Sequence, residues 1–175
     1  MSDTSDNTSR KPRRGWGLAG LLALAIPLGA CDFVAEKSLK PGESTEADVR
    51  RYMGNPEMIW EEQDGGRTLE YPRGPMGKQT YFVTIGPDGR YRSIEQVLDE
   101  AHFRRVQPGM TRDEVRQILG KPGEIARYRR QKEEVWSWRY LENNTRTMFF
   151  LAHFDRDTGK LKHTDAMQDW RTTGH

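Results

Sequence analysis

Few side chains in this 175-residue sequence are placed to do covalent or metal chemistry. The histidines His102, His153, His163 and His175 are scattered, and none is spaced with a carboxylate or thiol in a recognisable metal-binding pattern. The sequence also lacks the Gly-x-Ser-x-Gly and Ser-x-x-Lys patterns that indicate an activated serine. We therefore predict that the protein is not an enzyme and has no catalytic residue, no metal and no cofactor.

The charged clusters are also predicted to be structural or solvated. Asp155 to Gly159 opens like a calcium loop, but position twelve would be Ala166, which cannot supply a bidentate carboxylate, so a hairpin turn is expected. The acid pairs Glu61-Glu62 and Glu133-Glu134 are expected in solvated connections. The basic segment Arg127 to Lys132 is typical of a charged loop or edge strand, and contact with anionic lipid head groups is the alternative.

Cys31 is the only cysteine, so its thiol has no partner for a disulfide within the chain. A basic stretch with Arg10, Lys11, Arg13 and Arg14 precedes an uncharged apolar run from Trp16 to Leu28. That run is too short to span a bilayer as a helix but long enough for the core of an export signal. Leu28-Gly29-Ala30-Cys31 resembles the bacterial lipobox, which implies cleavage before Cys31 and acylation of its sulfur. The alternative is an ordinary signal peptide or membrane anchor with an incidental cysteine.

The charge balance argues against nucleic acid as a partner. The chain carries a formal net charge of +2 at pH 7, and residues 1–30 account for all of it, so the remainder is near neutral. No basic stripe with interleaved aromatic residues is present.

The chain repeats itself after the expected signal. Residues 49–59, which run from Val49 to Ile59, correspond to residues 115–125 at a constant spacing of 66, and Pro41-Gly42 corresponds to Pro108-Gly109. In the second copy, Thr111-Arg112-Asp113-Glu114 follows the capping-box pattern, and a helix from there to Gly120 is predicted. In the first copy, Ser44 or Thr45 is the expected cap and Gly54 the expected end.

Alternating apolar residues, and one continuous apolar run at 148–154, predict strands after each helix. They lie near residues 68–71 and 81–85 in the first copy, and near residues 136–140, 148–154 and after Leu161 in the second. Short helices are also expected ahead of each Pro-Gly pair, at residues 33–39 and 94–105. The predicted fold class is α+β, with two tandem repeats packed together, each a short helix pair followed by an antiparallel sheet of about three strands. The predicted segments are a signal at 1–30, repeats at 31–93 and 94–170, and a polar tail at 171–175.

The aromatic residues of the second copy are numerous for so small a sheet: Trp136, Trp138, Phe149, Phe150 and Phe154. We expect them chiefly in the core. The alternative is that some rings face outward and bind a partner.

The pattern Pro-Gly-x-Thr-x-x-x-Val-x-x-x-Leu-Gly-x-Pro, carried by residues 108–122, resembles the SmpA/OmlA family of BamE-like lipoproteins. The duplicated arrangement is also similar to that of β-lactamase inhibitory proteins. The first resemblance implies a non-catalytic, lipid-anchored scaffold or assembly factor for envelope proteins, located at the outer membrane with its body on the periplasmic side. Asp32 resembles a signal for retention at the inner membrane, which leaves that location open. Its implied partners are the lipid bilayer and envelope proteins, with the β-barrel assembly machinery among them, and no small-molecule substrate. The second implies a protein-binding inhibitory or ligand-binding module as the alternative.

Overall fold

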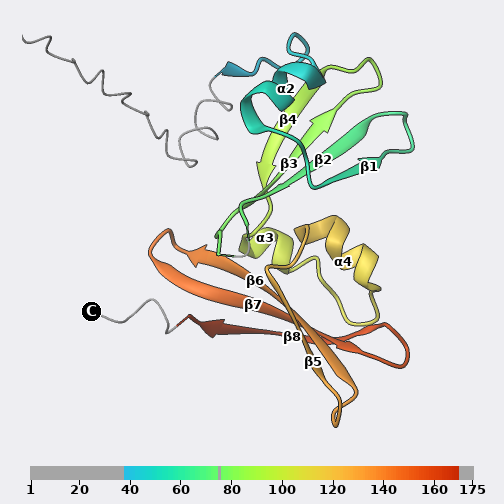
Figure 1. Cartoon of the computed structure of the whole chain (residues 1–175), viewed down its shortest axis with the longest axis vertical. Coiled ribbons are helices and arrows are strands. Elements are labelled where there is room, and N and C mark those ends of the chain that lie inside the picture. The colour runs from blue at the N-terminus through green and yellow to red at the C-terminus, as the bar shows by residue number, and fades with distance from the viewer. Residues whose placement is uncertain (1–37, 75, 170–175) are drawn as a thin grey trace, which may run out of the picture.

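The computed structural model describes residues 38–74 and 76–169, which form two antiparallel four-stranded sheets with short helices (Figure 1). The first half comprises residues 38–96 and the second half residues 97–169. In the first half the elements are α2 (Glu46–Met53), β1 (Met58–Glu61), β2 (Arg67–Pro72), β3 (Thr80–Ile85) and β4 (Tyr91–Gln96). In the second they are α3 (Glu100–Phe103), α4 (Arg112–Leu119), β5 (Glu124–Tyr128), β6 (Glu133–Glu142), β7 (Arg146–Asp155) and β8 (Leu161–Gln168). None of the described helices is both long and apolar enough to span a membrane.

Each sheet is a meander in which neighbouring strands are also consecutive in sequence, in the orders β1-β2-β3-β4 and β5-β6-β7-β8. The predicted α+β class is confirmed, but each sheet has four strands where about three were expected. The sequence pattern missed the edge strands β1 and β5. Both are short, and β5 is mostly exposed, so neither shows a clear alternation of apolar and polar residues.

The capping boxes form in both halves. In α4 the Thr111 backbone N–H donates to Glu114 Oε2 (2.6 Å) and the Glu114 N–H donates to Thr111 Oγ1 (3.2 Å). In α2 the cap is Thr45, and Asp48 takes the place of the glutamate. Gly54 and Gly120 end the helices with φ of +83° and +74°. Their ψ angles of −160° and −167° are extended, a combination with positive φ that residues with a Cβ rarely adopt.

Two hydrophobic cores result, one for each sheet and the helix that covers it. In the first, Val49 and Met53 of α2 pack against Leu69, Val83 and Ile85 of the sheet. The second contains the buried face of α4 and the inner face of β6 and β7. Its larger members are Phe103, Val115, Ile118, Leu119, Trp136, Trp138, Tyr140, Phe150 and Phe154. The second core also receives Phe82 from the first half, so the two halves share apolar contacts.

The prediction of a helix over residues 94–105 is wrong for its first part. Ile94 to Gln96 belong to β4, and only Glu100–Phe103 form a helix, capped by the Asp99 side chain. The first sheet therefore extends past residue 93, where the first repeat was expected to end. The helix expected at residues 33–39 lies mostly outside the described residues, so a helix pair is seen only in the second half, as α3 and α4.

Corresponding hydrogen bonds recur in the two halves. Tyr71 Oη donates to the Gly54 carbonyl (3.2 Å), and Trp138 Nε1 donates to the Gly120 carbonyl (3.0 Å). In each half an aromatic side chain of the sheet thus satisfies the carbonyl of the glycine that ends the helix. This contact holds the helix against its own sheet.

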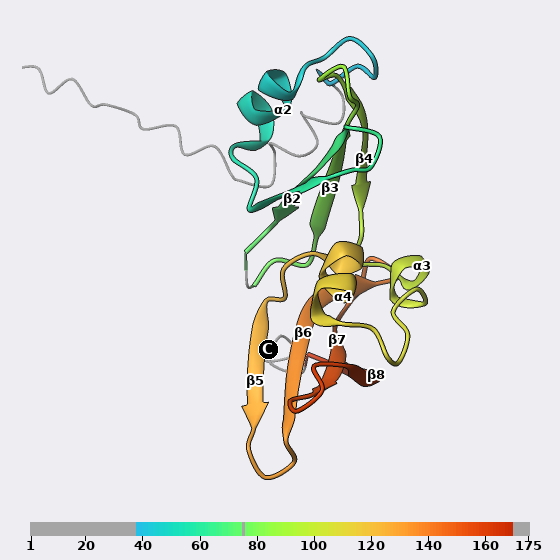
Figure 2. The same cartoon turned by 90° about the vertical axis from the view of Figure 1, so that its right-hand side faces the viewer.

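The two halves meet where the end of α4 reaches the face of the first sheet opposite α2; Figures 1 and 2 show α4 between the sheets from two directions. Glu70 of β2 is fully buried there and accepts hydrogen bonds from the Lys121 backbone N–H (2.7 Å) and from Arg116 Nε (3.4 Å). A second contact joins Arg139 Nη1 of β6 to the Met76 carbonyl (2.9 Å) in the β2–β3 connection. Polar and apolar contacts therefore join the halves.

Candidate functional site

The outer face of the second sheet, which we define as the face opposite α4, carries a hollow of about 620 Å³. Apolar residues form much of its floor. Val135 is buried, and Phe149 and Leu151 are half-buried. Tyr128 and Met167 at its sides are 49% and 44% exposed, high values for residues of this size. An open apolar hollow of this kind is typical of a surface that binds another molecule.

The aromatic residues of the second half divide between the two faces of the sheet. Trp136, Trp138, Phe150 and Phe154 are buried in the core, as expected. Phe149 lies on the outer face and lines the hollow. The alternative prediction, that some of these rings face outward, is therefore correct for Phe149 alone among the five.

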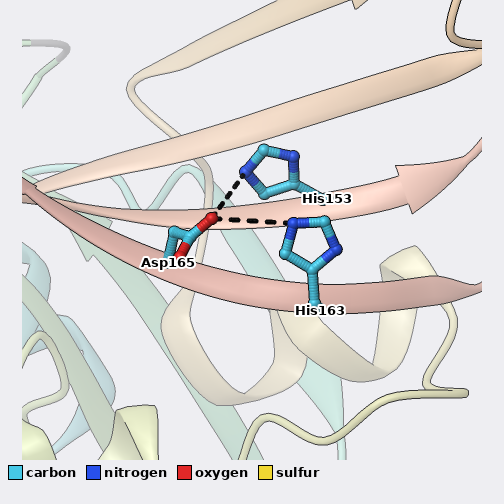
Figure 3. Close-up of side chains that lie close together, drawn as sticks. All are labelled: His153, His163 and Asp165. Atoms are coloured by element: carbon cyan, nitrogen blue, oxygen red, sulfur yellow. Dashed lines mark ion pairs between the residues drawn. The ribbon is translucent and has the colours of Figure 1, made fainter.

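Three potential metal ligands lie together on the same outer face (Figure 3): His153, His163 and Asp165. His153 of β7 is directly opposite His163 of β8 in the strand register, and their rings stack with centroids 4.3 Å apart. Asp165 follows His163 by two residues, so it lies on the same face of β8. The histidines are scattered in the sequence, and no recognisable metal-binding pattern includes this pair. Their spacing in sequence hides the contact because it depends on the register of a hairpin.

The other candidate residues are placed differently. His102 is buried in α3. Its Nδ1 lies 2.9 Å from Asp99 Oδ1 and its Nε2 lies 3.3 Å from Glu95 Oε1, so both ring nitrogens make contacts within the fold. Cys31 and His175 lie outside the described residues. The segment Asp155 to Gly159 is the β7–β8 hairpin turn that was predicted, and Asp155 Oδ1 accepts hydrogen bonds from the residues that follow it.

Glu133 and Glu134 begin strand β6 and are not the solvated pair that the sequence predicted. The Glu134 side chain is only 9% exposed and accepts three hydrogen bonds, from Arg112 Nε (2.8 Å), Arg127 Nε (2.8 Å) and Trp136 Nε1 (2.9 Å). Burial opposes ionisation, but the hydrogen bonds from Arg127, Arg112 and Trp136 outweigh it and lower the pKa of Glu134 to about 2. Glu134 therefore links α4 and β5 to β6.

We expect Glu134→Gln to lower the free energy of unfolding by about 2 kcal/mol at pH 7. Because the native pKa of about 2 lies below the ordinary value of 4.5, the charged carboxylate stabilises the fold fully above about pH 5. This contribution is lost as the pH falls toward 2. Urea unfolding of wild type and variant between pH 7 and pH 2.5 measures the difference, which should shrink on acidification.

The matched control is Glu61→Gln, since Glu61 is exposed at the end of β1. Its effect should stay within about 0.5 kcal/mol across the pH range. A Glu134→Gln effect that is independent of pH would show that the charge of Glu134 contributes nothing.

The basic segment Arg127 to Lys132 covers the end of the edge strand β5 and the turn into β6, as predicted. Arg127 pairs with Glu134, and Lys132 Nζ lies 2.8 Å from Asp157 Oδ2. Two of the basic residues are therefore used in contacts within the protein. Arg129 and Arg130 are exposed at the hairpin.

The fold is thus a pair of helix-covered antiparallel sheets, and its candidate site is the open outer face of the second sheet. Residues 95–157 match the family model described as "Outer membrane protein assembly factor BamE domain". The match spans roughly a third of the chain and begins within β4. The resemblance inferred from the sequence of residues 108–122 is confirmed for this segment. No curated protein matches the chain.

Three solved structures are among those similar to the chain. One is a putative β-lactamase inhibitor protein from Streptococcus mutans, with 10% identity, a TM-score of 0.32, and coverage of 79% of this chain and 96% of that one. Another is a DUF4309 family protein (YjgB) from Bacillus subtilis, with 15% identity, a TM-score of 0.29, and coverage of 81% and 95%. A third is an extracellular protein containing an SCP domain from Bacillus anthracis, with 10% identity, a TM-score of 0.29, and coverage of 95% and 51%.

Proposed function

We propose that the protein is a lipid-anchored, non-catalytic scaffold of the bacterial envelope that assists the assembly of outer-membrane proteins. The single observation that carries this proposal is the match of residues 95–157 to the BamE assembly-factor domain. The lipobox-like sequence before Cys31 supports an acyl anchor at that residue. The outer membrane is the proposed location, with the folded body in the periplasm.

We further propose that the chain is a tandem pair of BamE-like repeats. The sequence correspondence between residues 49–59 and 115–125 supports it. The equivalent capping boxes of Thr45 and Thr111 and the equivalent contacts of Tyr71 and Trp138 also support it. In such a duplicated chain the first sheet packs against the second half, and the outer face of the second sheet stays open for a partner.

The outer face of the second sheet is the proposed contact surface for envelope proteins. Its exposed Tyr128 and Met167 surround a floor of half-buried apolar side chains. Burial of such residues is the principal source of affinity in protein interfaces. Charged residues at the rim, among them Glu124 and Glu133, would select the orientation of the partner.

Complementation of a deletion strain tests this function. We expect deletion to lower the level of outer-membrane β-barrel proteins and to raise sensitivity to large antibiotics several-fold, and the wild-type gene to restore both. The Cys31→Ser variant should lose palmitate labelling and fail to complement, because the body is no longer held at the membrane. The Met167→Glu variant should be labelled normally yet complement poorly, because a charge enters the apolar hollow.

Ile59→Glu is the matched control for Met167→Glu, because Ile59 is 36% exposed on β1, away from the hollow. It should complement like the wild type. Unchanged barrel-protein levels and antibiotic sensitivity in the deletion strain would contradict a role in assembly. Capture of one envelope hydrolase by the wild-type protein, abolished by Met167→Glu, would instead identify an inhibitory module.

A further inference from the structure

The histidine–aspartate cluster of β7 and β8 has the composition of a transition-metal site. Two imidazoles and one carboxylate supply nitrogen and oxygen ligands, the set that Zn²⁺ and its neighbours in the first transition row accept. Calcium and magnesium are disfavoured because they require oxygen ligands almost exclusively. The residues come from two adjacent strands paired in a hairpin, so their backbones are held in a regular sheet.

The distances are close to those that a bound ion requires. Asp165 Oδ2 lies 3.8 Å from His153 Nε2 and 3.6 Å from His163 Nε2, as the dashed lines of Figure 3 mark. All three potential ligand atoms lie within 4.8 Å of one another. Ligands about 2.0–2.1 Å from a tetrahedral zinc ion are roughly 3.4 Å apart. The side chains of His163 and Asp165 are 50% and 63% exposed, so small rotations about their side-chain bonds can close the difference.

An independent observation singles out His153. Its Nε2 is buried and has no hydrogen-bond partner among the described residues. Buried polar atoms in folded proteins are almost always paired, so this ring nitrogen, which faces a carboxylate and a second imidazole, has a lone pair available for an ion. The metal-binding lone pair of a neutral imidazole is supplied by the nitrogen that carries no proton.

The other nitrogen of His153 is held in the manner expected of a metal ligand. Nδ1 lies 3.2 Å from Glu133 Oε2, and Glu133 Oε1 in turn accepts a hydrogen bond from Lys162 Nζ (2.9 Å). A carboxylate that accepts the proton of Nδ1 leaves Nε2 as the lone-pair donor and fixes the orientation of the ring. Glu133 is thus a positioning residue, and the contact from Lys162 fixes Glu133 itself.

We propose that His153, His163 and Asp165 bind one divalent transition-metal ion of the zinc type, with Glu133 orienting His153. Three protein ligands leave a fourth coordination position, which water or a donor group from a partner occupies. His153 and Glu133 also line the hollow of the outer face, so the ion lies at its margin. This site is independent of the proposed function in envelope assembly.

Titration of the purified full-length chain in detergent, after removal of metals with a chelator, tests the site. Calorimetry with ZnCl₂ should give one ion per chain with micromolar affinity. CoCl₂ should produce the visible absorption bands of a tetrahedral site with nitrogen and oxygen ligands. NMR of the histidine rings should show that zinc shifts Nε2 of His153 and His163 while the signals of His102 stay unchanged.

Variants assign the ligands. His163→Gln and Asp165→Asn should abolish stoichiometric binding, and both replace exposed side chains, so the fold is retained. Glu133→Gln should weaken affinity about 10-fold or more, the typical effect of losing a residue that orients a ligand. The matched controls are His175→Gln and Asp113→Asn, the latter at an exposed position in the first turn of α4. Both should bind zinc like the wild type. No saturable binding at millimolar zinc, or wild-type affinity in His163→Gln, would overturn the site.

Discussion

Replacement of Glu70 by alanine is expected to lower the free energy of unfolding by about 4 kcal/mol, the largest effect among the substitutions proposed for this protein. Glu70 has no solvent exposure and joins the first sheet to the end of α4 through Lys121 N–H and Arg116 Nε. Its removal leaves the Lys121 backbone amide and the Arg116 guanidinium, whose side chain is only 22% exposed, without their acceptor. Urea unfolding at neutral pH measures the loss.

Glu57→Ala is the matched control, since Glu57 also contacts Lys121 across the junction. It accepts from Lys121 Nζ (2.6 Å), but the two side chains are 40% and 51% exposed. An exposed ion pair contributes about 0.5 kcal/mol, so this variant should be almost as stable as the wild type. Glu70→Gln should fall between the two alanine variants, because its amide oxygen can still accept from Lys121 N–H. Equal losses for Glu70→Ala and Glu57→Ala would contradict a stabilising role for the buried carboxylate.

Gly120→Ala is expected to destabilise the protein by about 3 kcal/mol through two separate effects. The first is conformational, because Gly120 has φ of +74° and ψ of −167°, a region that residues with a Cβ rarely occupy. The second is steric. A Cβ at this position would lie 2.7 Å from Thr80 Cγ2 and 3.3 Å from Phe82 Cε1, both in the first half. Thr80 is 2% exposed, so it has little room to move.

Gly54→Ala separates the two effects, because Gly54 occupies the equivalent position at the end of α2. Its φ of +83° and ψ of −160° are similar, yet a Cβ there would have no atom within 4 Å. We expect a cost of about 1–2 kcal/mol, from the backbone alone. Thermal and urea unfolding of both variants give the difference, which measures how closely the two halves pack. Equal costs for the two glycines would mean that the junction yields to an added methyl group.

Local sequence was sufficient to predict the helices α2 and α4 and five of the eight strands. Thr111 with Glu114 and the apolar spacing of Val115, Ile118 and Leu119 predict α4 because capping and helix periodicity act within a few residues. Strands β2, β3 and β6 were recognised from their alternation, β7 from its apolar run and β8 from its start after the hairpin turn, which are also local signals. The edge strands β1 and β5 and the strand β4 were missed, since their pairing partners, and not their own pattern, hold them in the sheet.

The candidate site was largely hidden from sequence reasoning. Phe149 was recognised as one of five aromatic residues, but which face it occupies follows from its register against β6. His153 and His163 are ten residues apart, a spacing with no meaning until a hairpin places them opposite each other. In the sequence Glu134 is only one of two adjacent acidic residues. In the fold it accepts hydrogen bonds from three donors on different elements.

The sequence by itself therefore determined the caps, the glycine stops, the apolar faces and the resemblance of residues 108–122 to BamE-like proteins, because each depends on neighbours within one helix or strand. Tertiary structure alone decided which acids are buried, which histidines meet and which sheet face stays open. The physical reason is that a polar side chain carries no local signal of its burial. Its environment is set by strand register and by the packing of the two halves, which join residues distant in the chain.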